Sequence, residues 1–356
     1  MPGLRLTLTD RSHKFAAMPL GAPKKLSPVN GLGRSLGRRC VTGCLLALLL
    51  HSVQSATNST PAMNALTFAN SVQLQSLVDQ AAQDALEKFA TNKLAADQFA
   101  VTLVDLNGAR PMAANYRGGE RIYPASVVKL FYLVAAHRWM EDGRLQDTEE
   151  LRHGMRDMIV DSGNEATGLV VDSITETTSG PELPPEELEK WHDQRNAINR
   201  YFATLGYTNI NANRKPWNDG PYGRERQSVK IHQADDRNML TTDTTARLMT
   251  EIVTGRAVSP ERCQQMLELL RRDPTDTKAE GQVKGFIGET LPAGSKLWSK
   301  AGWTSQTCHD CAAVELPGGK KFVLTIFTVG HANEPEILQS LARSIISSLM
   351  KQDKPN

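Results

Sequence analysis

The pattern of apolar and polar residues predicts a helix followed by a β-hairpin between residues 74 and 121. From Leu74 to Phe89 apolar residues recur every three or four positions, which is the spacing of an amphipathic helix. The apolar run Phe99 to Asp105 favours a strand, and Asn107-Gly108 is typical of a turn. Residues Met112 to Arg121 then favour a second strand that returns beside the first.

The rest of the chain predicts a long helical stretch, three strands and a closing helix. Residues Thr148 to Thr250 are mainly helical in pattern, with long connections. Lys296 to Lys300, Ala312 to Leu316 and Lys321 to Val329 favour antiparallel strands. Asn333 precedes a segment with apolar residues at i and i+4, so we expect a final helix capped by Asn333.

Strands at both ends of this pattern, with helices between them, predict one discontinuous α/β (α+β) domain. We expect an antiparallel sheet with flanking helices over residues 70–351 and an inserted all-helical region at about 140–250, with an active site in the cleft between them. The acidic, Pro-rich stretch Ser179 to Gln194 is expected to be an exposed insertion. The alternative is a lid over the cleft, with Trp191 as a contact.

The first 55 residues resemble an export signal. Arg34, Arg38 and Arg39 precede an apolar run from Val41 to Leu50, and Val53-Gln-Ser55 ends in the small residue of a cleavage site. The apolar run is too short to span a bilayer comfortably. We therefore expect a periplasmic or secreted protein without a stable membrane anchor. Residues 56–69 are expected to form a flexible lead-in.

Removing this leader changes the charge of the chain. The leader carries 8 of the 41 Lys and Arg residues and one of the 39 Asp and Glu residues, which leaves 33 against 38 and a net charge of −5. No basic patch remains to favour nucleic acid. We expect a small-molecule substrate, no cofactor and a monomer.

Three cysteines remain after the leader: Cys263, Cys308 and Cys311. The string Cys308-His309-Asp310-Cys311 has the outline of a redox or zinc motif, but the chain has no second pair of cysteines. We expect buried thiols, with a disulfide to Cys263 or a metal site as the alternatives. His309 follows Lys300 closely enough along the chain to border the cleft.

Ser126 and Lys129 are the strongest candidates for chemistry. The i, i+3 spacing places both on one face of a helix, and Pro124 is compatible with the entry to that helix. The following residues are apolar almost all round, which predicts a buried helix. A dry setting lowers the pKa of a lysine amine toward that of a usable base for the serine hydroxyl.

The S-x-x-K spacing alone is weak, because Ser348 and Lys351 repeat it near the C-terminus. Further elements follow Ser126 in order. Ser162-Gly163-Asn164 is the only S-x-N in the chain, and Lys300-Ala301-Gly302-Trp303-Thr304 lies in the predicted β-rich region.

Together these motifs resemble the serine β-lactamase and penicillin-binding protein superfamily, and most of all the class A β-lactamases. The resemblance spans roughly Phe99 to Leu349. It implies that Ser126 attacks a carbonyl and becomes acylated, with Lys129 as proton acceptor. It also implies that Ser162 relays a proton to the leaving nitrogen, that Asn164 holds the substrate amide, and that Lys300 attracts a substrate carboxylate.

The remaining implied roles belong to the third motif, where the sequence departs from the family pattern. The backbone N–H groups of Ser126 and Trp303, beside Gly302, would stabilise the oxyanion. Gly163 replaces the family's Asp. Ala301 replaces a Thr or Ser that donates to the substrate carboxylate, a role that Thr304 could take.

The more serious departure concerns deacylation. Class A β-lactamases carry an E-x-x-L-N loop whose glutamate activates water, and Asn211 to Gln227 contains no such string. Glu225 is the candidate base in this loop, with Asp219 as the alternative. The resemblance predicts hydrolysis of β-lactam amides through an acyl-enzyme. Two alternatives stay open: a D-Ala-D-Ala carboxypeptidase or endopeptidase of peptidoglycan, and a covalent β-lactam receptor without turnover.

Overall fold

The computed structural model describes residues 66–352, apart from 234–236, 277 and 279–280. The chain divides into two units, Met1–Ser59 and Thr60–Asn356, and every described residue belongs to the second. The predicted leader and the lead-in up to residue 65 lie outside the described residues. In the described part of the chain, every helix is too short or too polar to cross a membrane.

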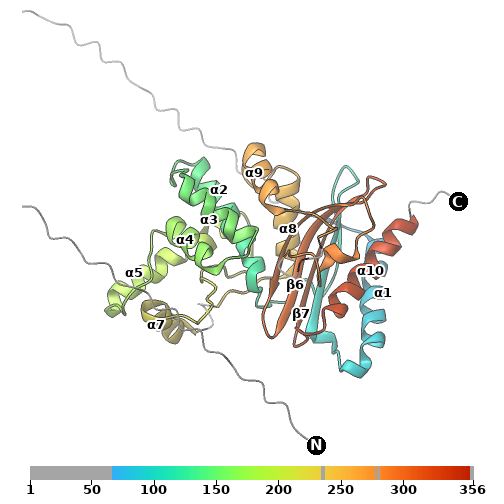
Figure 1. Cartoon of the computed structure of the whole chain (residues 1–356), viewed down its shortest axis with the longest axis horizontal. Helices are drawn as coiled ribbons and strands as arrows, with labels where there is room; N and C mark the ends of the chain where they lie inside the picture. The colour runs from blue at the N-terminus through green and yellow to red at the C-terminus, as the bar shows by residue number, and fades with distance from the viewer. Residues whose placement is uncertain (1–65, 234–236, 277, 279–280, 353–356) are drawn as a thin grey trace, which may run out of the picture. The chain divides into compact units, whose positions relative to one another are not determined.

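A mixed sheet forms the centre of the described unit (Figure 1). The strand order is β1-β3-β2-β7-β6-β5-β4; neighbouring strands are antiparallel except for the short parallel pair of β1 and β3. The strands are β1 (Ala69–Asn70), β2 (Phe99–Asp105), β3 (Met112–Tyr116), β4 (Arg271–Arg272), β5 (Lys296–Trp303), β6 (Thr307–Glu315) and β7 (Lys321–Val329).

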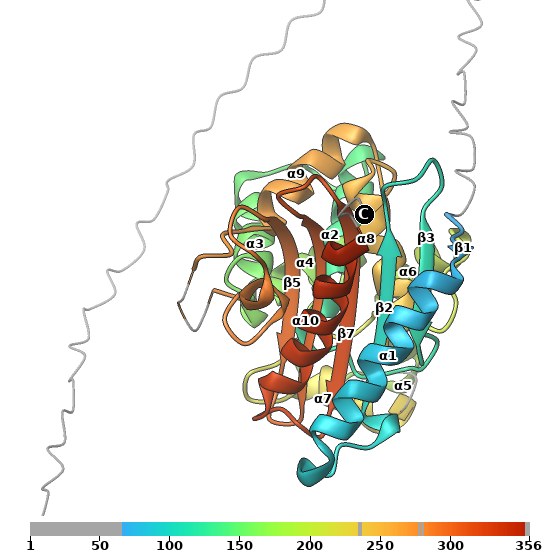
Figure 2. The same ribbon diagram turned by 90° about the vertical axis from the view of Figure 1, so that its right-hand side faces the viewer.

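Helices cover both faces of this sheet. The terminal helices α1 and α10 pack against each other and on one face, as Figure 2 shows. On the other face α8 contacts β2, β6 and β7, and the remaining helices lie beyond it. The α-helices are α1 (Val72–Lys88), α2 (Lys129–Glu141), α3 (Glu149–Ile159), α4 (Asn164–Thr175), α5 (Pro185–Arg195), α6 (Ala197–Thr204), α7 (Gly223–His232), α8 (Thr242–Val253), α9 (Pro260–Leu270) and α10 (Pro335–Gln352).

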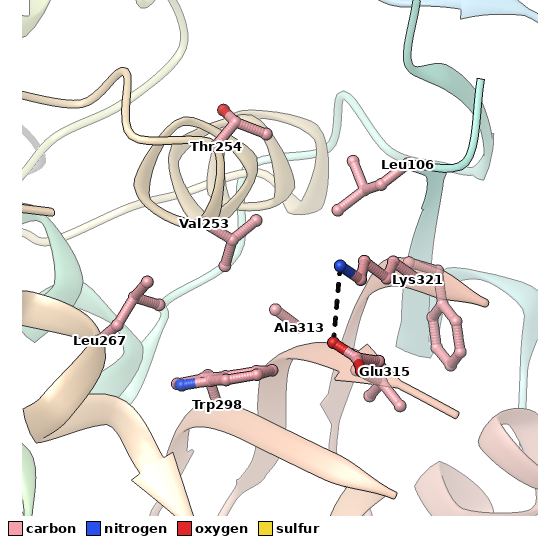
Figure 3. A pocket seen from close by; sticks show the side chains of 10 residues that line it. Leu106, Val253, Thr254, Leu267, Trp298, Ala313, Glu315 and Lys321 are labelled. Atoms are coloured by element: carbon pink, nitrogen blue, oxygen red, sulfur yellow. Dashed lines mark ion pairs between the residues drawn. The ribbon is translucent and has the colours of Figure 1, made fainter. Parts of the chain in front are cut away.

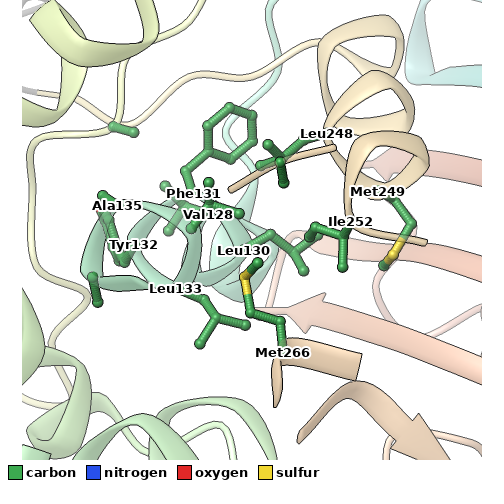
Figure 4. Packing of buried hydrophobic residues seen from close by; sticks show 14 of the residues in the cluster. Val128, Leu130, Phe131, Tyr132, Leu133, Ala135, Leu248, Met249, Ile252 and Met266 are labelled. Atoms are coloured by element: carbon green, nitrogen blue, oxygen red, sulfur yellow. The ribbon is translucent and has the colours of Figure 1, made fainter. Parts of the chain in front are cut away.

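Helix α2 lies at the centre of the helical region. Its residues from Leu130 to Ala136 are fully buried, which confirms the helix that the all-round apolar pattern predicts. Figure 4 shows Leu130 and Phe131 of α2 among side chains of α8 and α9, including Met266. Burying one side chain of this size stabilises the fold by about 1.5–3 kcal/mol. The helix that carries Lys129 is therefore a rigid support.

Most predicted elements are confirmed, but some boundaries differ. Strand β3 ends at Tyr116 and not at residue 121, because Arg117 takes a positive φ of 55° and turns the chain out of the sheet. Strand β5 continues past Lys300 to Trp303, and β6 begins at Thr307, five residues earlier than predicted. The string Cys308 to Cys311 is therefore part of a central strand.

Two further expectations need correction. The final helix begins at Pro335, so Asn333 lies two residues before it and not at its cap. The stretch Ser179 to Gln194 is not simply an exposed insertion, since it contains most of α5, whose Leu188 and Trp191 are buried. The Trp191 ring donates its N–H to the carbonyl oxygen of Thr178 (3.0 Å), the residue just before this segment.

Candidate active site

Ser126 lies on one turn of 3-10 helix, η3 (Ala125–Val128), that runs directly into α2. Pro124 caps this turn, and its carbonyl oxygen accepts a bond from the Val127 N–H (3.1 Å). Ala125 has a φ of 46°, in the left-handed region that residues with a Cβ avoid. Ser126 itself is only partly buried. The turn presents the serine at the start of a buried helix, with a strained residue immediately before it.

Strand β5 passes against this turn at Gly302. A Cβ at Gly302 would lie 2.8 Å from the Ser126 nitrogen and 2.8 Å from the Pro124 oxygen. Real Cβ atoms do not approach other atoms so closely, so the contact requires glycine. The glycine of the third motif therefore allows β5 to approach the backbone at Ser126 closely.

The residues after Gly302 close the hairpin between β5 and β6. The Thr304 N–H donates to the Thr307 carbonyl oxygen (3.0 Å), and bonded and non-bonded pairs alternate along an antiparallel ladder. The Trp303 N–H therefore points away from β6, towards the strand edge that contacts η3. This N–H and that of Ser126 are the donors expected of an oxyanion hole. The Thr304 hydroxyl accepts from the Gln306 N–H (3.0 Å) and lies 3.0 Å from the Thr307 hydroxyl, so it closes the hairpin turn.

Lys129 is buried, and its amine contacts only uncharged oxygens in the described residues. The Nζ atom donates to the Ser162 carbonyl oxygen (2.5 Å), to Asn164 Oδ1 (3.0 Å) and, at longer range, to Ser162 Oγ (3.3 Å). Burial lowers the pKa of Lys129 to about 7. Because the free amine is a base and the ammonium is not, the environment keeps Lys129 ready to accept a proton near neutral pH.

Ser162 joins this amine to a second buried lysine. The Lys300 Nζ atom donates to Ser162 Oγ (3.0 Å), so the hydroxyl lies between the amines of Lys129 and Lys300. Burial, together with the charges of Lys129 and Arg272, lowers the pKa of Lys300 well below its ordinary value. Ser162 has a φ of 56°, which places it in a sharp turn between α3 and α4. This hydroxyl is positioned to pass a proton.

Gln282 is a site residue that sequence reasoning missed. Its side-chain oxygen accepts from the Lys300 Nζ atom (2.6 Å) and from the Ala301 N–H (3.2 Å). Its Nε2 donates to the carbonyl oxygens of Ile159 (2.9 Å) and Val160 (2.8 Å) at the end of α3. One buried amide therefore ties the strand that carries Lys300 to the helical region. No motif or periodicity in the sequence marks it.

Asn218 is the second residue that the sequence did not single out. Its Oδ1 accepts a bond from Asn164 Nδ2 (2.8 Å), while Asn164 Oδ1 accepts from Lys129. Asn218 belongs to the irregular segment between α6 and α7, which is anchored to α2 where the Tyr132 hydroxyl donates to the Arg214 carbonyl oxygen (2.7 Å). The loop therefore contacts the site through the side-chain amide of Asn218.

Comparison with known proteins identifies the family. The family model described as beta-lactamase enzyme family matches residues 150–349, which is more than half of the chain. The chain belongs to the beta-lactamase enzyme family. No curated protein matches the sequence.

Solved structures of β-lactamases and a penicillin-binding protein show the same fold as this family member. A β-lactamase from Sphaerobacter thermophilus is 20% identical with a TM-score of 0.56, and the match covers 79% of this chain and 99% of that one. PBP-A is 17% identical with a TM-score of 0.55 and coverages of 80% and 99%. A class A β-lactamase from Bacteroides cellulosilyticus is 15% identical with a TM-score of 0.54 and coverages of 78% and 99%. The serine β-lactamase-like fold expected from the motifs is thereby confirmed.

Glu225, the predicted deacylation base, lies in a separate buried cluster of this β-lactamase-family chain. Its Oε1 accepts from Arg195 Nη2 (2.6 Å) and Ser179 Oγ (2.9 Å), and lies 3.5 Å from the Lys215 Nζ atom. Asp172 completes the cluster by accepting from Arg195 (2.8 Å) and Lys215 (2.5 Å). Two cations and two carboxylates balance each other here.

The contacts of Glu225 therefore favour a structural role. In the described residues its hydrogen bonds and ion pairs go to Arg195, Lys215 and Ser179, and none goes to Lys129 or Asn164. Asp219, the alternative, is exposed and directly follows Asn218. Whether either carboxylate acts in deacylation stays a prediction: the contacts of Glu225 count against it, and Asp219 is the chain neighbour of the residue that bonds to Asn164.

The three cysteine side chains make no hydrogen bond to Lys129, Ser162 or Lys300 in the described residues. Cys263, Cys308 and Cys311 are buried free thiols, and burial raises the pKa of each. In the described part of the chain no three His, Cys, Asp or Glu side chains gather as metal ligands would. A pocket of about 290 Å³, shown in Figure 3, lies near the start of β5 beside Trp298, and no predicted site residue lines it.

Proposed function

We propose that this protein is a serine hydrolase that opens β-lactam amides through an acyl-enzyme on Ser126. The observation that carries the proposal is Lys129, a buried amine with a pKa near 7 that contacts Ser162 and Asn164. The amine lies three residues after a partly exposed serine at the start of a helix. A base of this kind is what a serine hydroxyl requires to act as a nucleophile.

The proposed acylation step begins at Ser126. Lys129 accepts the Ser126 hydroxyl proton while Oγ bonds to the substrate carbonyl carbon. The oxyanion receives hydrogen bonds from the N–H groups of Ser126 and Trp303. When the C–N bond breaks, Ser162 passes a proton from Lys129 or Lys300 to the leaving nitrogen. Water later attacks the ester, which releases the acid and restores the Ser126 hydroxyl.

Lys300 has the electrostatic role in substrate binding. Its amine is fully buried, and its hydrogen-bond acceptors in the described residues are Ser162, Gln282 and Ala301. None of these acceptors carries a charge, so a substrate carboxylate would favour the ammonium form of Lys300. β-Lactams and D-Ala-D-Ala ends both carry such a carboxylate.

Asn218 favours a second candidate function, a D-Ala-D-Ala carboxypeptidase or endopeptidase. The loop residue that touches Asn164 is an amide, which cannot accept a proton from water as a carboxylate does. Acylation would then outpace release of a β-lactam product. The structure of a PBP-A variant is an acyl-enzyme complex with penicillin G. A similar adduct is expected to accumulate here.

The experiment measures nitrocefin turnover, D-Ala release from an acyl-D-Ala-D-Ala peptide, and adduct formation by intact mass. We expect a penicillin adduct, slow nitrocefin turnover, and loss of all three signals in Ser126→Ala. Ser348→Ala is the matched control, because Ser348 belongs to the second S-x-x-K on α10. An unchanged Ser126→Ala, or a wild-type protein with none of these signals, would overturn the proposal. A permanent adduct without turnover of either substrate would identify a receptor.

We also propose that the protein acts outside the cytoplasm on a small-molecule substrate. The support is the leader pattern Val41 to Leu50 with the cleavage pattern ending at Ser55, and the loss of excess positive charge after it. N-terminal sequencing of the protein from its host should find a start near Ala56. An intact leader on the mature protein would contradict export.

A further inference from the structure

The turn before Ser126 is held in a strained shape. Ala125 is buried and has a φ of 46°, a conformation that costs on the order of 1–3 kcal/mol for a residue with a side chain. Such a conformation persists only where the surroundings hold it. The start of the segment is fixed by two backbone bonds between Ile122 and Leu240 (2.8 and 2.9 Å). The contacts nearer to Ser126 come from strands β5 and β6.

His309 of β6 makes a side-chain hydrogen bond to this segment. Its Nε2 lies 2.9 Å from the Tyr123 carbonyl oxygen, and its Nδ1 accepts the Thr328 N–H (3.0 Å). Because Nδ1 is an acceptor, the proton of the neutral ring is on Nε2, and Nε2 donates to Tyr123. Burial lowers the pKa of His309 to about 4, so the ring is neutral at physiological pH. The hydrogen bonds therefore define a single tautomer.

The position of His309 in the sheet relates this bond to the nucleophile. His309 is the register partner of Gly302, the glycine that packs against the Ser126 nitrogen. The ring is fully buried and stacks at an angle on Phe327, with centroids 4.6 Å apart. Two neighbouring strands thus contact the turn: β5 at Gly302, which has no side chain, and β6 through the His309 imidazole.

We propose that His309 is a positioning residue that holds the Tyr123–Ser126 turn against β5, so that Ser126 faces the Trp303 N–H. The proposal rests on Ser126 being the nucleophile of the proposed function. Without the Nε2–H donor, the Tyr123 carbonyl loses its partner and the strained Ala125 loses one restraint. The Ser126 hydroxyl and N–H then move relative to the oxyanion donor, and a displacement of about 1 Å can cost on the order of 10²-fold in rate.

Two substitutions of His309 distinguish its hydrogen bond to Tyr123 from its hydrogen bond to Thr328. His309→Gln places an amide donor near the Nε2 position and loses the acceptor for Thr328. His309→Asn keeps an acceptor near the Nδ1 position and is too short to reach Tyr123. Each variant loses one hydrogen bond, so the two form a matched pair. Ile345→Val on α10, which removes one buried methyl group from the opposite face of the sheet, controls for a general loss of stability.

The test measures the acylation rate constant and the pre-acylation binding constant with a fluorescent penicillin, alongside thermal stability. We expect His309→Asn to acylate roughly 10- to 100-fold more slowly with nearly unchanged binding. His309→Gln and Ile345→Val should stay within about threefold of wild type. Equal rates in the Asn and Gln variants, at equal folded fraction, would overturn the proposal.

Amide hydrogen exchange at Ser126 and Val127 gives a readout that does not need activity. We expect faster exchange at these two amides in His309→Asn than in His309→Gln. If wild type forms no adduct, the proposed function fails, and the exchange rates alone decide whether His309 holds the turn. Equal exchange in both variants would refute the role of His309 whatever the activity.

Discussion

Two buried clusters among the described residues differ in how their charge is balanced; the first spans the helical region and β5, and the second lies among helices and loops. Around Ser162, the amines of Lys129 and Lys300 contact hydroxyl, carbonyl and amide oxygens. Around Glu225, two cations meet two carboxylates within 2.5–3.5 Å. A buried cation without a carboxylate loses its proton readily, whereas a paired one does not. The first cluster is suited to proton transfer and the second to holding segments together.

The two clusters correspond to two parts of the family pattern, the three motifs and the loop that carries Glu225. Hydrogen bonds join Lys129 of α2 to Ser162, in the turn before α4, and to Asn164 of α4, and Ser162 is also bonded to Lys300 of β5. The deacylation loop departs from that pattern, and its Glu225 ties Arg195 of α5 to the start of α7. One carboxyl, Asp310, is within electrostatic reach of Lys300, but in the described residues it forms no ion pair with it.

The largest expected effect is on Lys129. Lys129→Ala should slow acylation by roughly 10²-fold or more, because it removes the base of the unpaired cluster. Stopped-flow labelling with a fluorescent penicillin measures this rate, and thermal unfolding checks that the variant is folded. Labelling as fast as that of wild type would remove Lys129 from the mechanism.

Glu225→Gln should lower the stability of the protein and leave acylation and product release unchanged. Removing this carboxylate leaves Arg195, which is 1% exposed, without one of its charge partners. A buried charge left with no partner costs about 3–5 kcal/mol, and because Asp172 still pairs with Arg195 and Lys215 the loss here should be smaller. Urea unfolding should show the loss, while the folded variant acylates and releases product at the wild-type ratio. A stable variant that accumulates adduct would instead make Glu225 the deacylation base.

The acylation rate should depend on pH through Lys129. The pKa of Lys129 lies near 7 because of burial, and only the neutral amine accepts the serine proton. The rate should therefore rise about tenfold per pH unit below that value and level off above it. A stopped-flow series between pH 5 and 9 measures this profile. A rate that still rises about tenfold per pH unit at pH 9 would show that the amine keeps a pKa near the ordinary lysine value of about 10.4 and is charged at neutral pH.

The smallest expected effect comes from giving the first cluster a carboxylate. Asn218→Asp keeps an acceptor for Asn164 and adds a negative charge beside Lys129's partner. We expect release of the penicillin adduct to become several-fold faster, since a carboxylate can activate water, as general bases do. Asp219→Asn tests the alternative base in the same loop, and slower release of the adduct in that variant would assign the role to Asp219. Unchanged deacylation in Asn218→Asp would place the water elsewhere.

The sequence by itself determined the acylation motifs, the buried helix that carries Lys129 and most of the strands. Each of these depends on local spacing: i, i+3 for Ser126 and Lys129, and all-round apolar residues from Leu130 onward. Local spacing also predicted β2 and β7 with the observed boundaries. The leader, the substrate and the oligomeric state remain predictions.

The tertiary structure decided which polar residues share a site. Gln282, Asn218 and His309 reach Lys300, Asn164 and Tyr123 across 18, 54 and 186 positions of the chain. Such contacts depend on how the strands and loops cross, and no periodicity encodes them. The same reason explains Glu225. The sequence offers Glu225 as the candidate base of its loop, but the fold brings Arg195 of α5 and Lys215 of the α6–α7 segment beside it, and the ion pairs to these two buried cations hold the carboxylate in place.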